Sequence, residues 1–326
     1  MFDLLPLCVV LLIFFLVGRW IIRSRKLGDL SGRYVFITGC DTGFGNMLAK
    51  RLDSLGMNVF AGCLTQKGQQ DLDKATSKRL VTIALDVTSE ESILKAYNEV
   101  RQKLPNGKGL WGLVNNAGIA GNASPVEWQT VDNYRKCNDV NLYGMIHVTT
   151  MFLPIVRKAK GRIVNITSVM GRVALVTGPY VVSKYGAEGF CDCLRYQLYN
   201  CGVTVHIVEP GFFNTGIVNN ANIEASMKTS FEALDKEQKE FYGENYIPEM
   251  MVNANKSIGA AMSPDIYKVV DAFTHALIAA YPRTRYVVGL DANVVFRLIW
   301  SLPEWIGDRL VAALVNYPVP AGCQKH

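Results

Sequence analysis

The sequence is poor in the residues that build metal sites and disulfide frameworks. It holds four histidines and eight cysteines, and no two cysteines form a C-x-x-C pair. We therefore expect reduced, mostly buried thiols and neither a zinc site nor a disulfide framework. His147 and His206 stand among apolar residues, which favours packed imidazoles over catalytic bases.

Charged residues are also scarce, and they form no long basic block. Asp, Glu, Lys and Arg make up 19% of the chain, below the ~25% usual in soluble domains, which indicates a lipid-facing part. The net charge of +6 is spread along 326 residues, apart from a short cluster at Arg23, Arg25 and Lys26. We expect no nucleic-acid partner.

The first long apolar run, residues 4–22, approaches the ~20 residues that a helix needs to cross a bilayer. Arg19 and the basic cluster lie at its C-terminal end, the wrong side for a cleaved signal peptide. We expect residues 1–22 to form a membrane anchor, 23–32 a basic linker and 33–290 a catalytic domain. The bias of Lys and Arg to this flank predicts that the catalytic domain stays in the cytosol.

A strand, a glycine-rich turn and a helix open this domain. Residues 34–38 are β-prone, and Gly39, Gly43 and Gly45 follow before a helical pattern. Glycines let the backbone approach a phosphate, and a helix N-terminus offers free N–H groups and a positive dipole end. The spacing is Gly-x-x-x-Gly-x-Gly and not Gly-x-Gly-x-x-Gly, so the position of the turn is what indicates a dinucleotide site.

Strand and helix patterns alternate after this turn. Further strands are expected at residues 58–63, 81–85, 111–115, 162–167, 203–208 and 286–288. The alternation predicts an α/β fold of the Rossmann type, a doubly wound parallel sheet of about seven strands with helices on both faces. Neither an acid nor an Arg follows the second strand, where a ribose-binding acid usually stands.

Two segments stand apart from the alternation. Residues 216–262 carry Met and aromatic residues among charged ones, which suits a lid over an apolar substrate. Residues 291–326 are rich in Trp, Leu and Val but interrupted by charges and prolines. We expect this amphipathic tail to lie at a membrane surface.

Tyr180 and Lys184 lie four residues apart in a predicted helix and therefore share one helix face. A phenol titrates near pH ~10, and an ammonium within about 4–6 Å lowers that pKa. Tyr180 could then remove the proton of an alcohol, while Ser168 donates a hydrogen bond to the reacting oxygen. By itself the Tyr-x-x-x-Lys pattern recurs by chance.

Taken together, these motifs resemble the short-chain dehydrogenase/reductase family. The matching positions are Thr38, Gly39, Gly43, Gly45, Asn115 to Gly118, Asn141, Ser168, Tyr180, Lys184, Pro210 and Gly211. Residues 34–41, 109–114 and 282–286 further resemble its microsomal retinol dehydrogenase and hydroxysteroid dehydrogenase branch. The resemblance implies an NAD-dependent enzyme of the endoplasmic reticulum membrane that oxidises a lipid-like alcohol, with retinol favoured.

The resemblance also implies a role for each matching residue. Catalysis would fall to Asn141, Ser168, Tyr180 and Lys184, with Ser168 contacting the substrate and Asn141 holding a relay water. The cofactor would be bound by Gly39, Asp41, Gly43, Phe44, Gly45, Asp86, Val87, Asn115, Tyr180, Lys184 and Thr215. Thr177-Gly178-Pro179 stands where many relatives have glycines, and Pro179 narrows the loop beside the substrate.

The identities of the cofactor and of the substrate each have an alternative. Asp41 would repel a 2′-phosphate and Lys67 is the only cation close by in sequence, so NAD is expected over NADP. A 3α- or 17β-hydroxysteroid could replace retinol as substrate. A second alternative is a catalytically silent retinoid- or steroid-binding protein. The partners implied are the membrane, the alcohol and, as an option, a second copy of the chain.

Overall fold

The computed structural model describes residues 4–215, 220–259 and 262–324. A seven-stranded sheet, parallel throughout, forms its centre in the order β3-β2-β1-β4-β5-β6-β7. The strands are β1 (Tyr34–Thr38), β2 (Asn58–Cys63), β3 (Leu80–Ala84), β4 (Gly112–Asn115), β5 (Arg162–Ile166), β6 (Thr204–Pro210) and β7 (Arg285–Val288). The chain order reverses between β1 and β4, so the predicted doubly wound α/β fold is confirmed.

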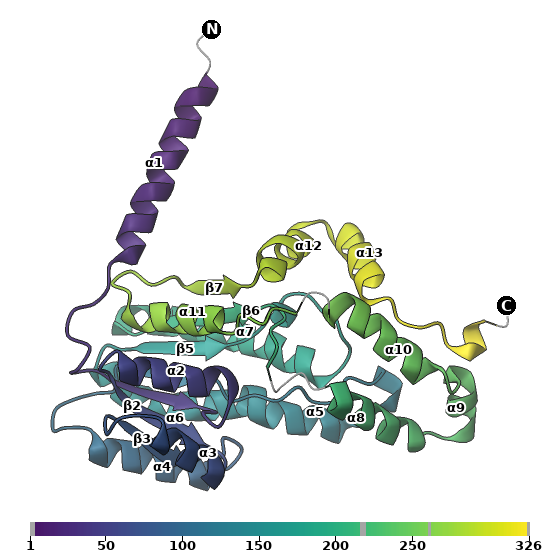
Figure 1. Ribbon diagram of the computed structural model, residues 1–326, viewed down its shortest axis with the longest axis horizontal. Helices are drawn as coiled ribbons and strands as arrows, with labels where there is room; N and C mark the ends of the chain where they lie inside the picture. The colour runs from purple at the N-terminus through teal and green to yellow at the C-terminus, as the bar shows by residue number, and fades with distance from the viewer. Residues whose placement is uncertain (1–3, 216–219, 260–261, 325–326) are drawn as a thin grey trace.

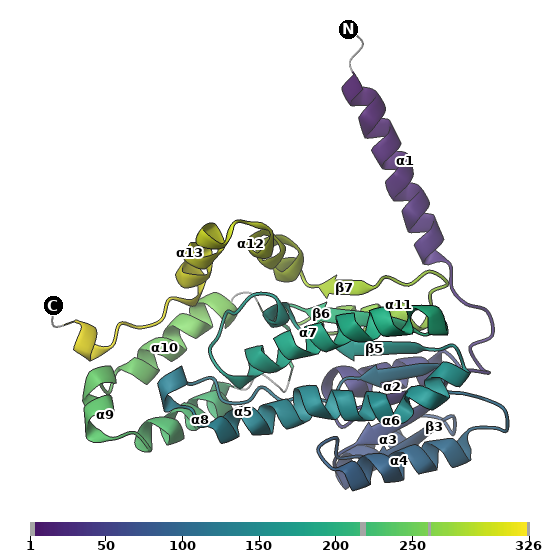
Figure 2. The same cartoon turned by 180° about the vertical axis from the view of Figure 1, so that it is seen from behind.

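Helices cover both faces of this sheet (Figures 1 and 2). One face packs on α2 (Gly43–Ser54) and α11 (Tyr267–Ile278), and the other on α4 (Glu90–Lys103), α6 (Met145–Lys158) and α7 (Pro179–Leu198). A shorter helix, α3 (Gln66–Lys74), links β2 to β3. Successive residues of β1 alternate between the two cores, since Val35 and Ile37 face the first and Phe36 the second. Apolar residues at every position of such a strand reflect burial on both faces.

The sequence predicts one long helix over residues 131–158, but the structure divides it. A π-helical turn, η2 (Asp139–Gly144), separates α5 (Val131–Asn138) from α6. Asn141 lies in this turn and is 1% exposed. Single π turns inside α-helices are frequent at functional sites, so the irregular turn marks this position independently of the motif.

Helix α1 (Leu4–Ser24) projects away from the domain (Figure 1). Over the described ranges, no helix combines the length and the apolarity needed to cross a bilayer. The predicted spanning anchor is therefore not confirmed. The link after α1 is tied to the domain, because Leu27 N–H donates to Ile278 O at 2.8 Å and Ala280 N–H donates to Arg25 O at 2.7 Å.

The two segments that lack the alternation are mostly helical. The first contains α8 (Asn220–Glu232), α9 (Lys236–Tyr242), α10 (Tyr246–Ala254) and the π turn η5 (Asn255–Gly259). Trp128 and Met227 join residues of α10 in a small core of their own. The second contains η6 (Ala292–Phe296), α12 (Arg297–Ser301) and α13 (Glu304–Val315). Helices α12 and α13 lie on the same side of the molecule as α1 (Figures 1 and 2).

All eight cysteines are free, but only half of them are buried. The expectation of mostly buried thiols is therefore wrong for Cys8, Cys193, Cys201 and Cys323, which are exposed. Cys8 belongs to the projecting helix α1 and Cys323 to the C-terminal tail, so neither reaches the core.

Candidate active site

Two glycines of the turn after β1, Gly39 and Gly45, leave no room for a side chain. Gly39 has a φ of +70°, and a Cβ there would lie 2.8 Å from Ala117 Cα. A Cβ on Gly45 would lie 2.4 Å from the carbonyl oxygen of Gly39, whereas Gly43, at φ +64°, faces open space. Thr42 forms no side-chain cap on α2, which leaves the first N–H groups of that helix for an anion. This cradle fits the pyrophosphate of a nicotinamide dinucleotide.

Asn116 holds the glycine turn in place. Its side-chain N–H groups donate to the carbonyls of Thr38 and Gly39, each at 3.0 Å. Its neighbour Asn115, expected at the cofactor, turns its side chain into the sheet core and donates to Asn165 at 2.8 Å. The side chain of Asn115 therefore lies away from the turn. The sequence alone does not distinguish these two adjacent Asn residues. Their roles differ because successive side chains at the end of a strand point to opposite sides.

Asp41 supplies an acid at the end of β2, where the sequence has none. Its carboxylate accepts hydrogen bonds from the N–H groups of Leu64 and Thr65, each at 2.8 Å. It also accepts one from the Thr65 hydroxyl at 2.6 Å. The negative charge thus stands beside the place where the adenosine ribose is held in dinucleotide folds.

The other expected cofactor residues follow the ends of their strands. Phe44 is buried against Phe213, with ring centres 6.1 Å apart. Asp86 follows β3 and accepts from Thr88 N–H at 2.9 Å, and Val87 is buried in the second core. Thr215 lies after β6 and is partly buried. Their contacts with a cofactor remain predictions.

Tyr180, Ser168 and Lys184 meet at the carboxyl ends of β5 and β6. Lys184 Nζ lies 5.5 Å from the centre of the Tyr180 ring and donates to Ile166 O at 3.4 Å. The Ser168 hydroxyl donates to Pro210 O at 3.5 Å. The structure therefore brings the three predicted catalytic side chains together.

Burial controls the protonation of this group. It raises the pKa of Tyr180 to about 12, although the hydrogen bond with Ser168 opposes the rise. It lowers the pKa of Lys184 to about 8, against the attraction of nearby groups including Glu188. The expectation of a lowered Tyr180 pKa is therefore wrong for this structure, because burial raises that pKa overall. Removing both groups from water has a larger effect than their proximity.

Asn141 is fixed between the loop after β4 and helix α7. Its side-chain amide donates to Ile119 O at 2.9 Å and to the Ser183 hydroxyl at 3.0 Å, and accepts from Ile119 N–H at 2.8 Å. Ser183 in turn donates to Tyr180 O at 2.7 Å. Both amide hydrogens are therefore in use, which positions the backbone of Tyr180. The relay water remains a prediction.

An apolar cavity of about 140 Å³ adjoins the site. Its walls come from the loop between Ser168 and Tyr180, from Phe212 after β6, from α10 and from the C-terminal tail. Tyr180 packs in the same apolar cluster as Leu175 and Phe212, two of the lining residues. Such a site suits an apolar molecule that carries one reactive polar group.

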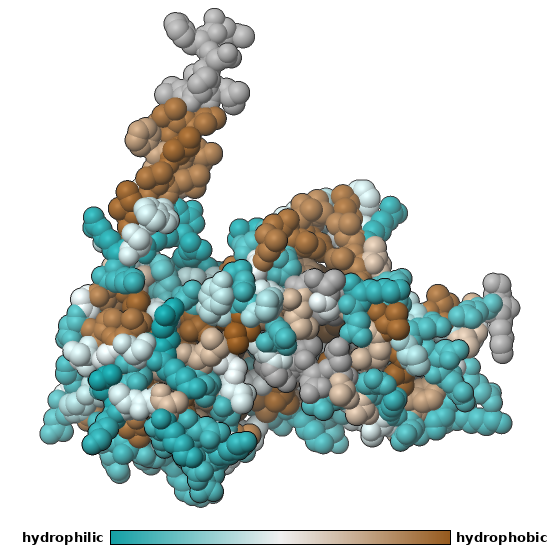
Figure 3. Space-filling view, in the orientation of Figure 1, coloured by the Kyte–Doolittle hydropathy of each residue, from teal (hydrophilic) through white to brown (hydrophobic). Residues whose placement is uncertain are grey.

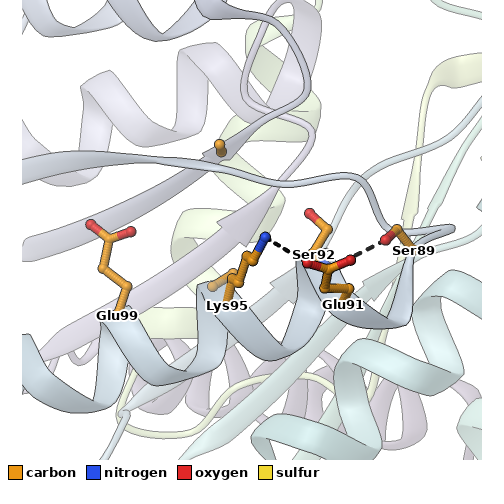
Figure 4. A pocket seen from close by; sticks show the side chains of 7 residues that line it. Ser89, Glu91, Ser92, Lys95 and Glu99 are labelled. Carbon is orange, nitrogen blue, oxygen red and sulfur yellow. Dashed lines mark hydrogen bonds and ion pairs between the residues drawn. The ribbon is translucent and has the colours of Figure 1, made fainter.

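A second hollow, of about 340 Å³, lies along α4. Figure 4 shows that charged and hydroxyl side chains line it, among them Glu91 and Lys95, which form an ion pair at 2.7 Å. None of the expected site residues belongs to its lining. Its charged and hydroxyl lining does not suit a lipid-like substrate.

Known proteins are similar to this sequence over most of its length. The family profile described as short chain dehydrogenase matches residues 33–226. Retinol dehydrogenase 16 of Mus musculus is 46% identical over 301 residues, which cover 91% of this chain and 94% of that enzyme. Human 17-beta-hydroxysteroid dehydrogenase type 6 is 43% identical over 303 residues, which cover 93% of this chain and 94% of that enzyme.

Two solved structures share the fold. A short-chain dehydrogenase from Streptomyces avermitilis superposes with a TM-score of 0.65 at 22% identity, covering 86% of this chain and 95% of that one. A short chain dehydrogenase from Burkholderia cenocepacia J2315, solved in complex with NADP, superposes with a TM-score of 0.64 at 22% identity, covering 86% and 98%. At this identity the two structures show the fold alone.

Proposed function

The chain belongs to the short-chain dehydrogenase family, whose members include oxidoreductases acting on alcohol groups, and from this premise we propose that it oxidises a lipid-like alcohol with NAD. Retinol, converted to retinal, is the substrate we favour. The observation that carries the proposal is that Tyr180, Ser168 and Lys184 meet beside an apolar cavity. The names of the two relatives, a retinol and a hydroxysteroid dehydrogenase, support a lipid-like alcohol.

The proposed chemistry assigns one task to each catalytic side chain. Bound oxidised nicotinamide would accept the hydride that leaves the carbinol carbon. The Tyr180 phenolate takes the hydroxyl proton, so the alcohol becomes a carbonyl compound and the phenolate a phenol. Ser168 hydrogen-bonds the reacting oxygen. Lys184 is protonated below its pKa of about 8, and its positive charge then favours the phenolate.

The charges around the ribose position support NAD over NADP. Asp41 lies at the end of β2, and Leu64 and Thr42 beside it are exposed and uncharged. A 2′-phosphate would bring close to two further negative charges next to this carboxylate. Lys67 is exposed on the first turn of α3, where we interpret it as a solvated side chain.

The exposed apolar surface of α1, α12 and α13 supports attachment to a membrane (Figure 3). Residues 9–17 of α1 are exposed and apolar on all sides of the helix, a pattern that suits lipid and not water. We place the protein at the endoplasmic reticulum membrane, with residues 33–290 in the cytosol. The division into anchor, linker, catalytic domain, lid and tail is part of this proposal.

A second copy of the chain is proposed as a partner of α7. Val182, Tyr185 and Tyr196 are exposed at spacings that place them on one face of this helix. Gly189 between them has open space where a side chain would stand, so another helix can approach closely. Cross-linking of the detergent-solubilised chain should give a dimer, and Tyr185→Glu should reduce it.

Turnover by the purified full-length chain tests the proposed function. Retinol, a 3α-hydroxysteroid and a 17β-hydroxysteroid are each supplied with NAD, and reduced nicotinamide is followed by its absorbance. The proposal expects the highest kcat/KM with retinol. A higher value with a steroid would replace the substrate and keep the chemistry. Tight binding of these lipids with no reduction of NAD would instead identify a silent binding protein.

A further inference from the structure

The cavity has a closed inner end beside the catalytic residues. Leu175 and Phe212, 4% and 8% exposed, line it there. Leu175 belongs to the loop that leads to Tyr180. Phe212 follows Pro210, whose carbonyl accepts the hydrogen bond from Ser168. An alcohol carbon held at this end would therefore lie next to the proposed base.

The outer end of the cavity opens at the surface. Val295 and Leu314 line it and are 39% and 37% exposed. The volume of about 140 Å³ is below the roughly 300–1,000 Å³ of pockets that bury most of a drug-sized molecule. The cavity thus has room for one end of an elongated molecule, while the other end extends through this mouth.

Residues 314–317, which we term the C-terminal strap, hold one side of the mouth. The hydroxyl of Tyr317 accepts a hydrogen bond from Thr177 N–H at 3.1 Å. The carbonyl of Asn316 accepts one from the side chain of Asn253, on α10, at 2.8 Å. The strap therefore connects α13 both to the loop before Tyr180 and to α10.

The mouth opens within an apolar surface formed by η6, α12 and α13. Figure 3 shows this surface as a continuous hydrophobic patch over the C-terminal helices. Its exposed apolar side chains are Val294, Leu298, Trp305 and Leu310. The guanidinium of Arg309 lies 5.6 Å from the Trp305 ring. Tryptophan and arginine side by side at the edge of an apolar face are typical of a membrane interface.

Helix α1 indicates what covers this patch. It leaves the domain on the side that carries α12 and α13 (Figures 1 and 2), and its exposed apolar residues have no protein partner among the described ranges. Its C-terminal flank and the patch together expose the cations Arg19, Arg25, Lys26, Arg297 and Arg309 against the acids Asp29, Glu304 and Asp308. The excess of cations complements anionic lipid headgroups.

We infer that the alcohol enters the site directly from the lipid phase, through the mouth between Val295 and Leu314. This inference rests on the proposed function and adds the route by which the substrate arrives. The apolar body moves from lipid into the cavity without crossing water, so its transfer carries no large hydrophobic penalty. The hydroxyl end leads, because Leu175 and Phe212 at the closed end of the cavity pack in one cluster with Tyr180.

Blocking the mouth tests the position of the cavity. Leu314→Trp places an indole in the opening, and we expect it to weaken retinol binding and to lower kcat/KM by about tenfold, equal to 1.4 kcal/mol. Leu310→Trp is the matched control, because Leu310 lies one turn earlier on α13 with similar exposure and does not line the cavity. The inference is overturned if both variants behave alike. NADH binding, measured on both, checks that they are folded.

Charging the patch tests the route. The double variant Leu298→Glu, Trp305→Glu leaves the cavity lining intact but repels the bilayer. We expect kcat/KM to fall by about tenfold when retinol is supplied in phosphatidylcholine vesicles that hold the full-length chain. It should stay within about twofold when retinol is supplied on cyclodextrin to the detergent-solubilised chain. An equal fall under both conditions, or no fall in vesicles, contradicts entry from lipid.

Leu94→Glu serves as the control for added charge. Leu94 is exposed on α4. In Figure 1 this helix lies at the opposite side of the molecule from α12 and α13, and the variant should match the wild type under both conditions. The wild-type chain separates the two hypotheses. If it binds retinol without reducing NAD, the proposed oxidation fails, and retinol binding to the Trp variants still decides the route into the cavity.

Discussion

The exposed side chain of Leu64 stands beside the carboxylate of Asp41, which accepts a hydrogen bond from the N–H of Leu64 at 2.8 Å. This pair occupies the position that distinguishes NAD from NADP in dinucleotide folds. An acid whose one nearby cation in sequence, Lys67, is interpreted as a solvated side chain disfavours a 2′-phosphate. An Arg at position 64 would offer that phosphate a charge-assisted partner without disturbing the bonds that Asp41 accepts.

We therefore predict that Leu64→Arg shifts the cofactor preference toward NADP by about 10- to 100-fold, since hydrogen bonds to charged groups contribute about 1.5–3 kcal/mol. The measurement is the ratio of kcat/KM for the two cofactors. Leu64→Gln is the control for shape without charge and should leave the ratio near that of the wild type. A wild-type preference for NADP would contradict the charge argument itself.

The contact of Asp41 with Leu64 could not be predicted from the sequence, because it joins the turn after β1 to the end of the neighbouring strand. The strands themselves were predictable, since most are largely apolar segments, and central ones such as β1 and β4 are buried on two faces. The same limit explains the pKa of Tyr180. The spacing of Tyr180 from Lys184 is a local property, which the sequence shows directly. The burial that raises the pKa of Tyr180 to about 12 depends on tertiary packing.

The π turn at η2 and the helices α8 to α10 could also not be predicted from the sequence. A π turn changes the hydrogen-bond step without a distinct residue pattern, so residues 131–158 have the periodicity of one helix. The region from α8 to α10 packs its apolar residues on Trp128 and not on the sheet. Its pattern therefore lacks the strong single stripe of a helix that covers a sheet.

Tyr180→Phe should abolish turnover while leaving cofactor binding nearly intact. The phenolic oxygen is the proposed base, and removing a general base costs about 10²–10⁴-fold in rate. The cofactor is expected on the glycine turn, which this change does not touch. Single-turnover oxidation of retinol and NADH titration measure the two effects. Tyr185→Phe changes an exposed tyrosine on the same helix and is the control. A Tyr180→Phe variant with more than about a tenth of the wild-type rate would exclude Tyr180 as the general base.

Tyr317→Phe tests whether the C-terminal strap positions the substrate loop. The variant loses the hydroxyl that accepts the hydrogen bond from Thr177 N–H, a contact with a net contribution of about 0.5–1.5 kcal/mol. We expect KM for retinol to rise by about threefold with kcat nearly unchanged, because Tyr317 does not contact the catalytic residues. Tyr281→Phe, exposed before β7, should change neither constant. A fall in kcat alone would argue against a role in substrate binding.

We predict that His206 makes folding stability depend on pH. The imidazole is 3% exposed and hydrogen-bonded to Arg283 O and to Thr204 at 2.7 and 2.8 Å, which confirms the predicted packed histidine. Burial lowers its pKa from 6.5 to about 4, so between these values the unfolded chain binds more protons than the folded one. Stability is therefore lost as the pH falls from 6.5 to 4, by roughly 3 kcal/mol from this group.

Thermal unfolding of the wild type and His206→Gln between pH 4 and 7 measures this contribution. Glutamine keeps hydrogen-bonding groups at the position but does not titrate. The stability difference between the two proteins should shrink or reverse toward pH 4, because only the wild type gains a buried charge there. Parallel curves over the whole range would show that His206 does not carry the dependence.

The side of the membrane that the catalytic domain occupies can be determined from three glycosylation sequons. Asn165 in β5 is fully buried and should stay unmodified in either compartment. Asn122 is partly buried and donates to Ser230 at 2.8 Å, so it is not fully open to modification. Asn255 lies in the π turn η5, and its side chain is exposed. Asn255 is therefore the most informative reporter.

The excess of cations after residues 4–22 predicts a cytosolic domain, so the protein expressed in cells should show no mobility shift on endoglycosidase treatment. A positive control moves the excess of cations from the C-terminal to the N-terminal side of the apolar run. Replacing Arg23, Arg25 and Lys26 by Gln and adding lysines before the apolar run should turn part of the population toward the lumen. That fraction should then gain a shift that Asn255→Gln removes, which shows that the sequon can be used. If the wild-type chain itself shows a shift that is lost in Asn122→Gln or Asn255→Gln, the domain lies in the lumen, because glycan transfer requires exposure to that compartment.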